Sequence, residues 1–118
     1  MLSVFHNDKF IDYMLHNGKL APVTTMRLVA VVDTSDPEEA FKLTNNVDNP
    51  WPQNETVTPE STSESYRSTS VGDLVVDGMA GARGSKHLIV EPCGFRELTI
   101  EEVSTLCFCL PTVVTKER

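Results

Sequence analysis

The sequence predicts one α+β domain, a mostly antiparallel β-sheet with two or three short helices packed on it. The strand-like run Thr24–Thr34 carries apolar side chains on both faces. An explicit helix start, Asp36-Pro37-Glu38-Glu39, follows it directly. Two further apolar runs, Val71–Asp77 and Lys86–Glu91, are separated by glycines, as in a hairpin. A half-barrel is one form that such a sheet could take, and all 118 residues fit a single domain.

The N-terminal part predicts a short strand at Leu2–Phe5 and a helix over residues 8–16. Asn7 or Asp8 can cap this helix, and Gly18 can end it. The helix would place four apolar side chains on one stripe: Phe10, Ile11, Met14 and Leu15.

The run Thr24–Thr34 predicts a central strand in the middle of the core. Val29 and Val31 would lie on one face. The other face would carry Met26, Leu28, Ala30 and Val32. We therefore expect packing on both sides of this strand.

The next helix is expected to run from Pro37 to about Asn45. Asp36 can accept hydrogen bonds from the first unpaired amides, and Glu39 can reach back as in a capping box. Residues 48–70 then form a long loop rich in Pro, Ser and Thr, and its part after Thr58 is expected to be flexible. We expect the indole of Trp51 to fold back as a lid on the domain; anchoring a partner is the alternative.

Glycines dominate the connection of the predicted hairpin, which favours a long mobile tip. Beyond the hairpin, Gly94-Phe95 indicates a turn, with Phe95 returning to the core. The run Thr99-Ile100-Glu101-Glu102 predicts a second capping box and a helix that continues to Pro111. A strand over residues 106–110 is the competing interpretation.

Composition and charge indicate the kind of partner and the cellular compartment. Ten basic and 17 acidic residues give a net charge of −7, which disfavours nucleic-acid binding in general and favours a basic surface on a protein partner. No apolar run reaches the ~20 residues of a membrane span, and the first residues do not resemble a signal peptide, so we expect a cytoplasmic protein with no membrane contact. Three cysteines then predict buried or half-buried thiols without disulfides or a metal. Composition does not determine the oligomeric state, and a homodimer is compatible with it.

Motifs of known chemistry are not evident. The glycine-rich segment 78–86 has Gly-Ser-Lys where a phosphate loop needs Gly-Lys-Ser/Thr, and it precedes a strand instead of a helix. His6, His16 and His87 lack partners at ligand spacing, and no nucleophile elbow or zinc-protease motif is present. We therefore expect a protein without enzymatic activity or a cofactor.

The run Arg67-Ser68-Thr69-Ser70-Val71-Gly72-Asp73 has two interpretations. In the structural one, the hydroxyls bond local amides, Gly72 adopts an unusual dihedral angle and Asp73 closes a turn. In the functional one, Arg67 and the hydroxyls recognise an anion or a backbone.

From Met26 to Leu98 the chain resembles small YodL-type proteins, which are carried by phages, plasmids and integrative elements. The matching features are Val-Ala-Val-Val-Asp-Thr in the long strand, the run from Arg67 to Asp73, and Gly94-Phe95, together with Ala40-Phe41, Thr44-Asn45-Asn46, Trp51 and Asn54. The resemblance implies a mobile-element origin and brings no established activity. It groups a candidate partner-binding surface, to which we add Asp73: Asn45, Trp51, Asn54, Arg67, Ser68, Thr69, Ser70 and Asp73.

These observations favour a small phage or mobile-element accessory protein that binds a host protein and modulates it, most simply by inhibition. The alternative is a nucleic-acid or nucleotide-binding module with a half-barrel like those of PUA and ASCH domains. In that case Arg67, Arg83 and Lys86 would line a cleft.

Overall fold

The computed structural model describes residues 1–8, 24–45, 51, 57–59 and 67–109. The helix predicted over residues 8–16 and the flexible part predicted after Thr58 lie almost entirely outside these residues, and Asn54 lies outside them as well.

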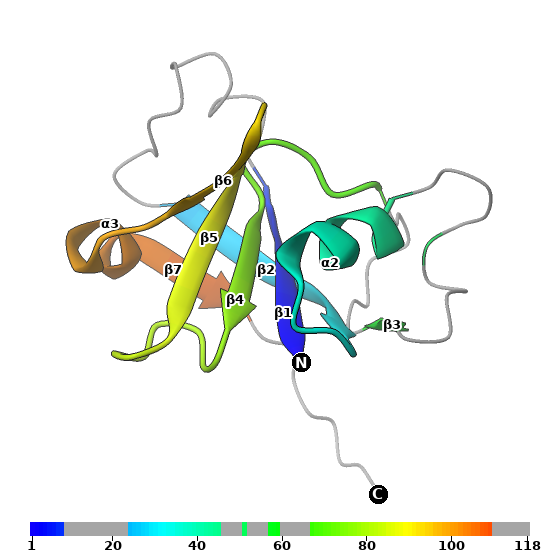
Figure 1. The fold of residues 1–118 in the computed structure, drawn as a ribbon. Helices are drawn as coiled ribbons and strands as arrows, with labels where there is room; N and C mark the ends of the chain where they lie inside the picture. Colours follow the sequence, from blue (N-terminus) through cyan, green and yellow to red (C-terminus); the bar gives the residue numbers. More distant parts are fainter. Residues whose placement is uncertain (9–23, 46–50, 52–56, 60–66, 110–118) are drawn as a thin grey trace, which may run out of the picture.

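Within these residues, seven strands form one sheet in the order β3-β2-β1-β4-β5-β6, with β7 pairing with β2 (Figure 1). Every pair is antiparallel except β2 with β7, which is parallel. The predicted α+β class and mainly antiparallel sheet are confirmed. The strands are β1 (Leu2–Asn7), β2 (Thr24–Val32), β3 (Val57–Pro59), β4 (Leu74–Asp77), β5 (Lys86–Glu91), β6 (Gly94–Glu97) and β7 (Leu106–Cys109). The described helices are α2 (Pro37–Leu43) and α3 (Ile100–Ser104).

The centre of the sheet differs from the prediction. The short strand expected at Leu2–Phe5 extends to Asn7 and lies between β2 and β4, and all its side chains except that of Ser3 are buried. Strand β2 lies beside it and carries β3 along one half and β7 along the other half of its second edge. The N-terminal strand is therefore as central as the long apolar run.

A β-bulge in β2 corrects the predicted alternation. Val4 pairs with Ala30, but Phe5 pairs with Leu28, so Val29 is an extra residue in β2. An extra residue reverses the side-chain alternation. Met26 and Leu28, which were expected to share a face with Ala30 and Val32, therefore pack on the opposite side of the sheet.

Two hydrophobic clusters cover the two faces, which confirms the predicted packing on both sides. Helix α2 lies over β1 on one face, and α3 lies beside β7 at the other end of the molecule (Figure 1). Cluster 1 contains Leu2, Val4, Val29, Ala30, Val32, Ala40, Trp51, Val57 and Val75. Cluster 2 contains Phe5, Met26, Leu74, Val76, Ile89, Leu98 and Leu106.

Helix α2 begins as predicted, but its capping contacts differ in one respect. The Asp36 carboxylate accepts a hydrogen bond from the amide of Glu38 at 3.0 Å. Glu39 does not reach the Asp36 amide, because the Thr34 hydroxyl lies between them. That hydroxyl accepts from the Asp36 amide at 3.1 Å and donates to the Glu39 carboxylate.

The segment after Thr99 begins as the predicted helix and continues as the competing strand. Thr99 and Glu102 form the expected capping box, but α3 ends at Ser104. Residues 106–109 then pair with β2, with Leu106 and Phe108 packed against cluster 2. Pairing with β2 prevails over the helical spacing of the apolar residues in this segment, because it satisfies the backbone and buries these two side chains at once.

The β4–β5 hairpin is confirmed, and its glycines adopt positive φ angles of +117° at Gly78, +79° at Gly81 and +82° at Gly84. A Cβ at Gly78 would overlap the Ser85 side chain, whereas one at Gly84 would meet no atom within 4 Å. Gly78 is therefore required for both its dihedral angle and its space, and Gly84 for its dihedral angle alone.

We expect Gly78→Ala to destabilise the protein more than Gly84→Ala does. Both variants carry the left-handed strain of roughly 1–2 kcal/mol, and only Gly78→Ala adds a clash with Ser85. The measurement is the free energy of unfolding from urea titration. Equal losses in the two variants would contradict this packing of the hairpin tip.

Candidate functional site

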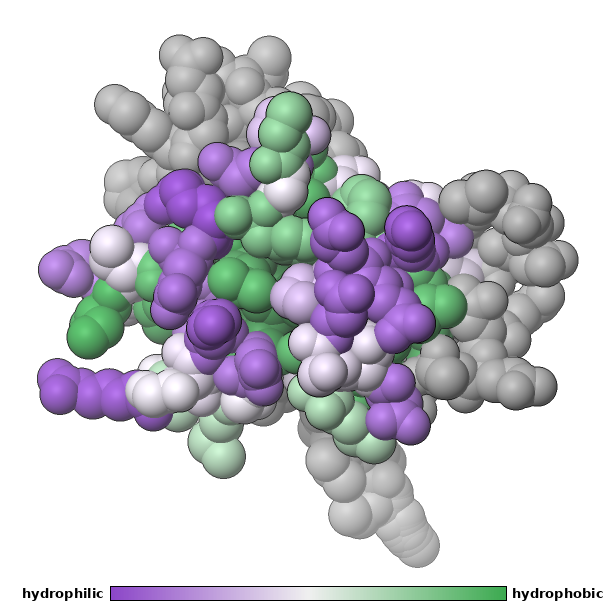
Figure 2. Space-filling view, viewed as in Figure 1, coloured by the Kyte–Doolittle hydropathy of each residue, from purple (hydrophilic) through white to green (hydrophobic). Residues whose placement is uncertain are grey.

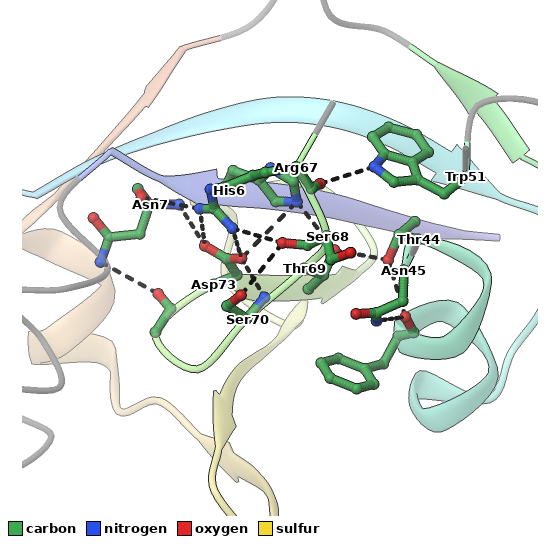
Figure 3. Close-up of polar contacts among 12 residues, drawn as sticks. His6, Asn7, Thr44, Asn45, Trp51, Arg67, Ser68, Thr69, Ser70 and Asp73 are labelled. Carbon is green, nitrogen blue, oxygen red and sulfur yellow. Dashed lines mark hydrogen bonds and ion pairs between the residues drawn. The ribbon is translucent and has the colours of Figure 1, made fainter. Parts of the chain in front are cut away.

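The described residues of the candidate surface gather at one end of the sheet (Figure 3). The segment 67–73 runs there beside the end of β1 and the end of α2, before the chain enters β4. The amide of Thr69 donates to the carbonyl of Thr44 at 3.0 Å, which ties the segment to the helix.

A buried ion pair forms the centre of this region. The Arg67 guanidinium donates to both carboxylate oxygens of Asp73, each at 2.7 Å, in a bidentate arrangement. The Asp73 side chain is fully buried (0% exposed), and that of Arg67 is 28% exposed. The same guanidinium also donates to the carbonyls of Asn7 at 3.2 Å and Ser68 at 2.9 Å.

Two backbone amides complete the surroundings of Asp73. Those of Asn7 and Ser70 donate to its carboxylate at 2.8 and 2.7 Å. Burial raises the pKa of Asp73, while hydrogen bonds from Arg67 and the two amides lower it. With four N–H donors on two oxygens, this carboxylate serves as a structural anchor and has little capacity left for a ligand.

The segment 70–73 forms the tight turn that the structural interpretation predicts. The Asp73 amide donates to the Ser70 carbonyl at 3.0 Å. Gly72 has a φ of +95°, a conformation that suits the third residue of a type II turn. The Asn7 side-chain amide donates to the Gly72 carbonyl at 3.3 Å and so holds the turn against β1.

A chain of hydroxyl groups extends from His6 to α2. The Thr44 hydroxyl donates to the Ala40 carbonyl at 2.8 Å, and the Thr69 hydroxyl donates to Thr44 at 2.7 Å. The single proton of Thr69 is thereby used, so its oxygen accepts from Nε2 of His6 at 3.0 Å. The chain therefore selects the imidazole tautomer with its proton on Nε2.

His6 is neutral in this environment. Burial and the nearby positive charge of Arg67 lower its pKa to about 3, against a smaller opposite effect of Asp8. Its Nε2 lies 3.9 Å from Asp73, too far for a hydrogen bond.

Trp51 closes the region from the side of cluster 1. Its indole N–H donates to the Arg67 carbonyl at 2.8 Å, and its ring meets that of His6 edge-on at a centroid distance of 6.4 Å. The side chain is fully buried (0% exposed). This position agrees with the lid that the sequence predicts.

The structure thus brings most of the candidate surface together. Asn45 lies at the end of α2, where its side-chain amide donates to the Phe41 carbonyl. Trp51, Thr69 and Asp73 are buried, so contact with a partner would fall to the partly exposed members. These are Asn45, Arg67, Ser68 and Ser70.

Sequence reasoning missed three members of the network: His6, Asn7 and Thr44. The helix-end position of Thr44 is visible in the sequence. No spacing connects His6 or Asn7 with segment 67–73, however, because only the β1–β4 pairing brings them together. In the sequence, the available signal is that two polar residues, His6 and Asn7, directly follow the apolar run Leu2–Phe5.

Metal ligation has no support within the described ranges, since no group of three His, Cys, Asp or Glu residues comes together there. The thiols of Cys93, Cys107 and Cys109 are free, and they are exposed, whereas the sequence predicts that they are buried or half-buried. Cys107 and Cys109 alternate with inward-facing residues of β7, which places both thiols on its outer face.

A cleft of about 580 Å³ lies elsewhere, between the β4–β5 hairpin tip, α3 and β7. Arg83 and Lys86 line it, as the nucleotide-binding alternative expects. Arg67, the third basic residue of that hypothesis, is held by Asp73 and does not line this cleft.

No family model, curated protein or solved structure matches this chain. The resemblance to YodL-type proteins therefore stays a prediction. Within the part of the chain that the structure describes, neither helix has the length and apolarity that a membrane span requires.

We expect Asp73→Asn to lower the free energy of unfolding by about 3 kcal/mol, because Arg67 would lose its buried counter-charge. The matched control is Asp8→Asn, which breaks the exposed Asp8–Arg27 pair of 3.1 Å and should cost less than about 1 kcal/mol. Urea titration measures both. Similar losses in the two variants would show that the buried pair has no special weight.

The low pKa of His6 predicts a loss of stability in acid. Unfolded His6 binds a proton below about pH 6.5 and folded His6 only below about 3, so stability falls as the pH drops through this window. The slope is about 1.4 kcal/mol per pH unit. His6→Gln, which can still donate to Thr69, should lose this contribution and keep that of His87, whose pKa burial also lowers. The free energy of unfolding can be measured by urea titration at several pH values, with Trp51 fluorescence as the signal. If it depends on pH in His6→Gln as it does in the wild type, the prediction is wrong.

Proposed function

We propose that this chain is a small accessory protein of a phage or another mobile element, and that it binds a host protein and inhibits it. The observation that carries the proposal is a partly exposed apolar strip beside the candidate surface. We define the apolar strip as Leu43, Leu88 and Phe95, with their exposed surface.

The strand register places Leu88 and Phe95 on one face of the sheet. Leu88 pairs with Val75 and Phe95 pairs with Val90, and directly opposed residues of an antiparallel pair share a face. Leu43 and Phe95 both pack against cluster 1 from its edge. Figure 2 shows the result as hydrophobic atoms gathered between β5 and α2, with hydrophilic atoms on both sides. An apolar centre with a polar rim is the usual anatomy of a protein interface.

The candidate surface adjoins this strip at the end of α2. The hydrogen bonds from Thr69 to Thr44 hold segment 67–70 against that helix end. Partly exposed Asn45, Ser68 and Ser70 can therefore offer amide and hydroxyl groups next to the apolar side chains. The Arg67–Asp73 pair would keep these groups in position before a partner binds, which lowers the entropic cost of association.

Charge favours a basic partner. The net charge of −7 would attract it from a distance, and Glu38 and Glu39 are exposed on α2 beside the apolar strip. A host protein with a basic, partly apolar segment fits these features.

The alternative is a nucleic-acid or nucleotide-binding module with a half-barrel. It draws support from the curvature of the sheet, since Phe108 of β7 meets the rings of Phe5 in β1 and His87 in β5, at centroid distances of 5.3 and 5.9 Å. Arg67, however, is held by Asp73 and does not line the cleft of Arg83 and Lys86, so the three basic residues do not form the one site that this alternative requires. We therefore favour the protein-binding function.

The test is affinity capture from host-cell lysate with the wild-type chain and with Leu88→Glu. We expect a stoichiometric protein partner that Leu88→Glu fails to retain, because a carboxylate would be buried in an apolar interface. Ile100→Glu is the matched control, since Ile100 is 67% exposed on α3 and lies outside the apolar strip. Absence of a stoichiometric partner, or equal loss with both variants, would contradict the proposal.

A further inference from the structure

We infer that the cleft between the β4–β5 hairpin tip, α3 and β7 is a binding site for a small phosphate monoester on a flat ring, of the size of a nucleoside monophosphate. The cleft opens on the side of cluster 2, whereas the apolar strip lies on the side of cluster 1. The inference is therefore independent of the proposed protein-binding function.

The distribution of positive charge carries the argument. The described residues include six Lys and Arg side chains. Three of them, Arg27, Arg67 and Arg96, form ion pairs with carboxylates. The other three, Lys42, Arg83 and Lys86, have no ion pair with any described residue, and two of them, Arg83 and Lys86, line this cleft. Two uncompensated cations at one cleft in an acidic protein indicate an anionic ligand.

The loop that carries these cations is held in shape from within. His87 is buried, and its Nε2 accepts from the Gly81 amide at 2.9 Å. The Ser85 hydroxyl accepts from the Met79 amide at 2.8 Å, and the Ser85 amide donates to the Ala82 carbonyl at 3.3 Å. These hydrogen bonds hold the tip in one arrangement, and the mobility that the glycines predict stays a prediction.

The outer turn of this loop presents donors to the solvent. Arg83 and Gly84 are its two central residues, and Gly84 has a φ of +82°. Their backbone amides make no hydrogen bond to any other described residue. Unpaired amides next to a guanidinium and an ammonium group supply the donors that phosphate oxygens need. A glycine-rich loop can therefore bind phosphate here without the sequence order of a phosphate loop.

The opposite wall of the cleft is apolar. Leu98 and Leu106 belong to cluster 2, and Val103 and Phe108 pack against it. Phe108 supplies an aromatic ring beside Gly81, whose missing side chain leaves space along that ring. A flat ring would contact this wall while its phosphate reached the hairpin tip. The volume of about 580 Å³ suits a ligand of this size.

One carboxylate among the described residues of the cleft would repel an anionic ligand, so its removal tests whether the site prefers negative charge. Glu97 also borders the cleft and is exposed, and its pairing with Leu88 directs its side chain to the side of cluster 1. Its negative charge should weaken the binding of a phosphate, although water screens it. Removal of this charge should therefore strengthen binding, whereas removal of either cation should weaken it.

The experiment is calorimetric titration of the full chain with adenosine monophosphate, uridine monophosphate, adenosine and inorganic phosphate. We expect a Kd below about 1 mM for at least one monophosphate and weaker binding of adenosine and of phosphate alone. Arg83→Gln and Lys86→Gln should each weaken binding about tenfold, and Glu97→Gln should strengthen it about twofold. Lys42→Gln is the matched control, because Lys42 is an exposed cation on α2 that does not line the cleft.

Three results would overturn the inference. The first is the absence of saturable monophosphate binding, and the second is an equal loss with Lys42→Gln and Arg83→Gln. The third is binding of a single-stranded RNA oligonucleotide without binding of any mononucleotide, which would make the cleft part of a nucleic-acid surface. Since all four substituted side chains are exposed or partly exposed, circular dichroism can verify that each variant keeps its fold.

Discussion

The buried carboxylate of Asp73 is the constraint around which this end of the protein is arranged. A charge removed from water needs a counter-charge and hydrogen bonds, and Asp73 obtains them from Arg67 and from the amides of Asn7 and Ser70. These donors belong to three separate parts of the chain: the end of β1, the segment before β4 and the turn itself. Satisfying one carboxylate therefore fixes the path of the whole segment 67–73.

The same network links separate elements on the side of cluster 1. Through Thr69 and Thr44 it reaches the end of α2, and through the Arg67 carbonyl it reaches the indole of Trp51 in cluster 1. Segment 67–73, which has the composition of a polar binding motif, thus makes many of its hydrogen bonds to other parts of the protein. Its partly exposed groups gain a fixed position from this arrangement, and that fixed position is what the proposed protein-binding surface requires.

The two proposed sites divide the molecule by chemistry. The side of cluster 1 combines partly exposed apolar side chains with the acidic surface of α2, which suits a basic protein partner. The side of cluster 2 holds a cleft whose rim carries Arg83 and Lys86. Ligands at the two places would contact different residues, the apolar strip in one case and the hairpin tip, α3 and β7 in the other. A small ligand and a protein partner could therefore bind at the same time.

Local signals in the sequence determined the α+β class, the start of both described helices, the β4–β5 hairpin and the turn closed by Asp73. Each depends on residues a few positions apart, so the chain itself contains the information. The tertiary structure alone decided the central place of β1, the bulge at Val29, the strand after Ser104 and the entry of His6 and Asn7 into the network. These features depend on pairing between distant segments, where burial and backbone hydrogen bonding outweigh local preference.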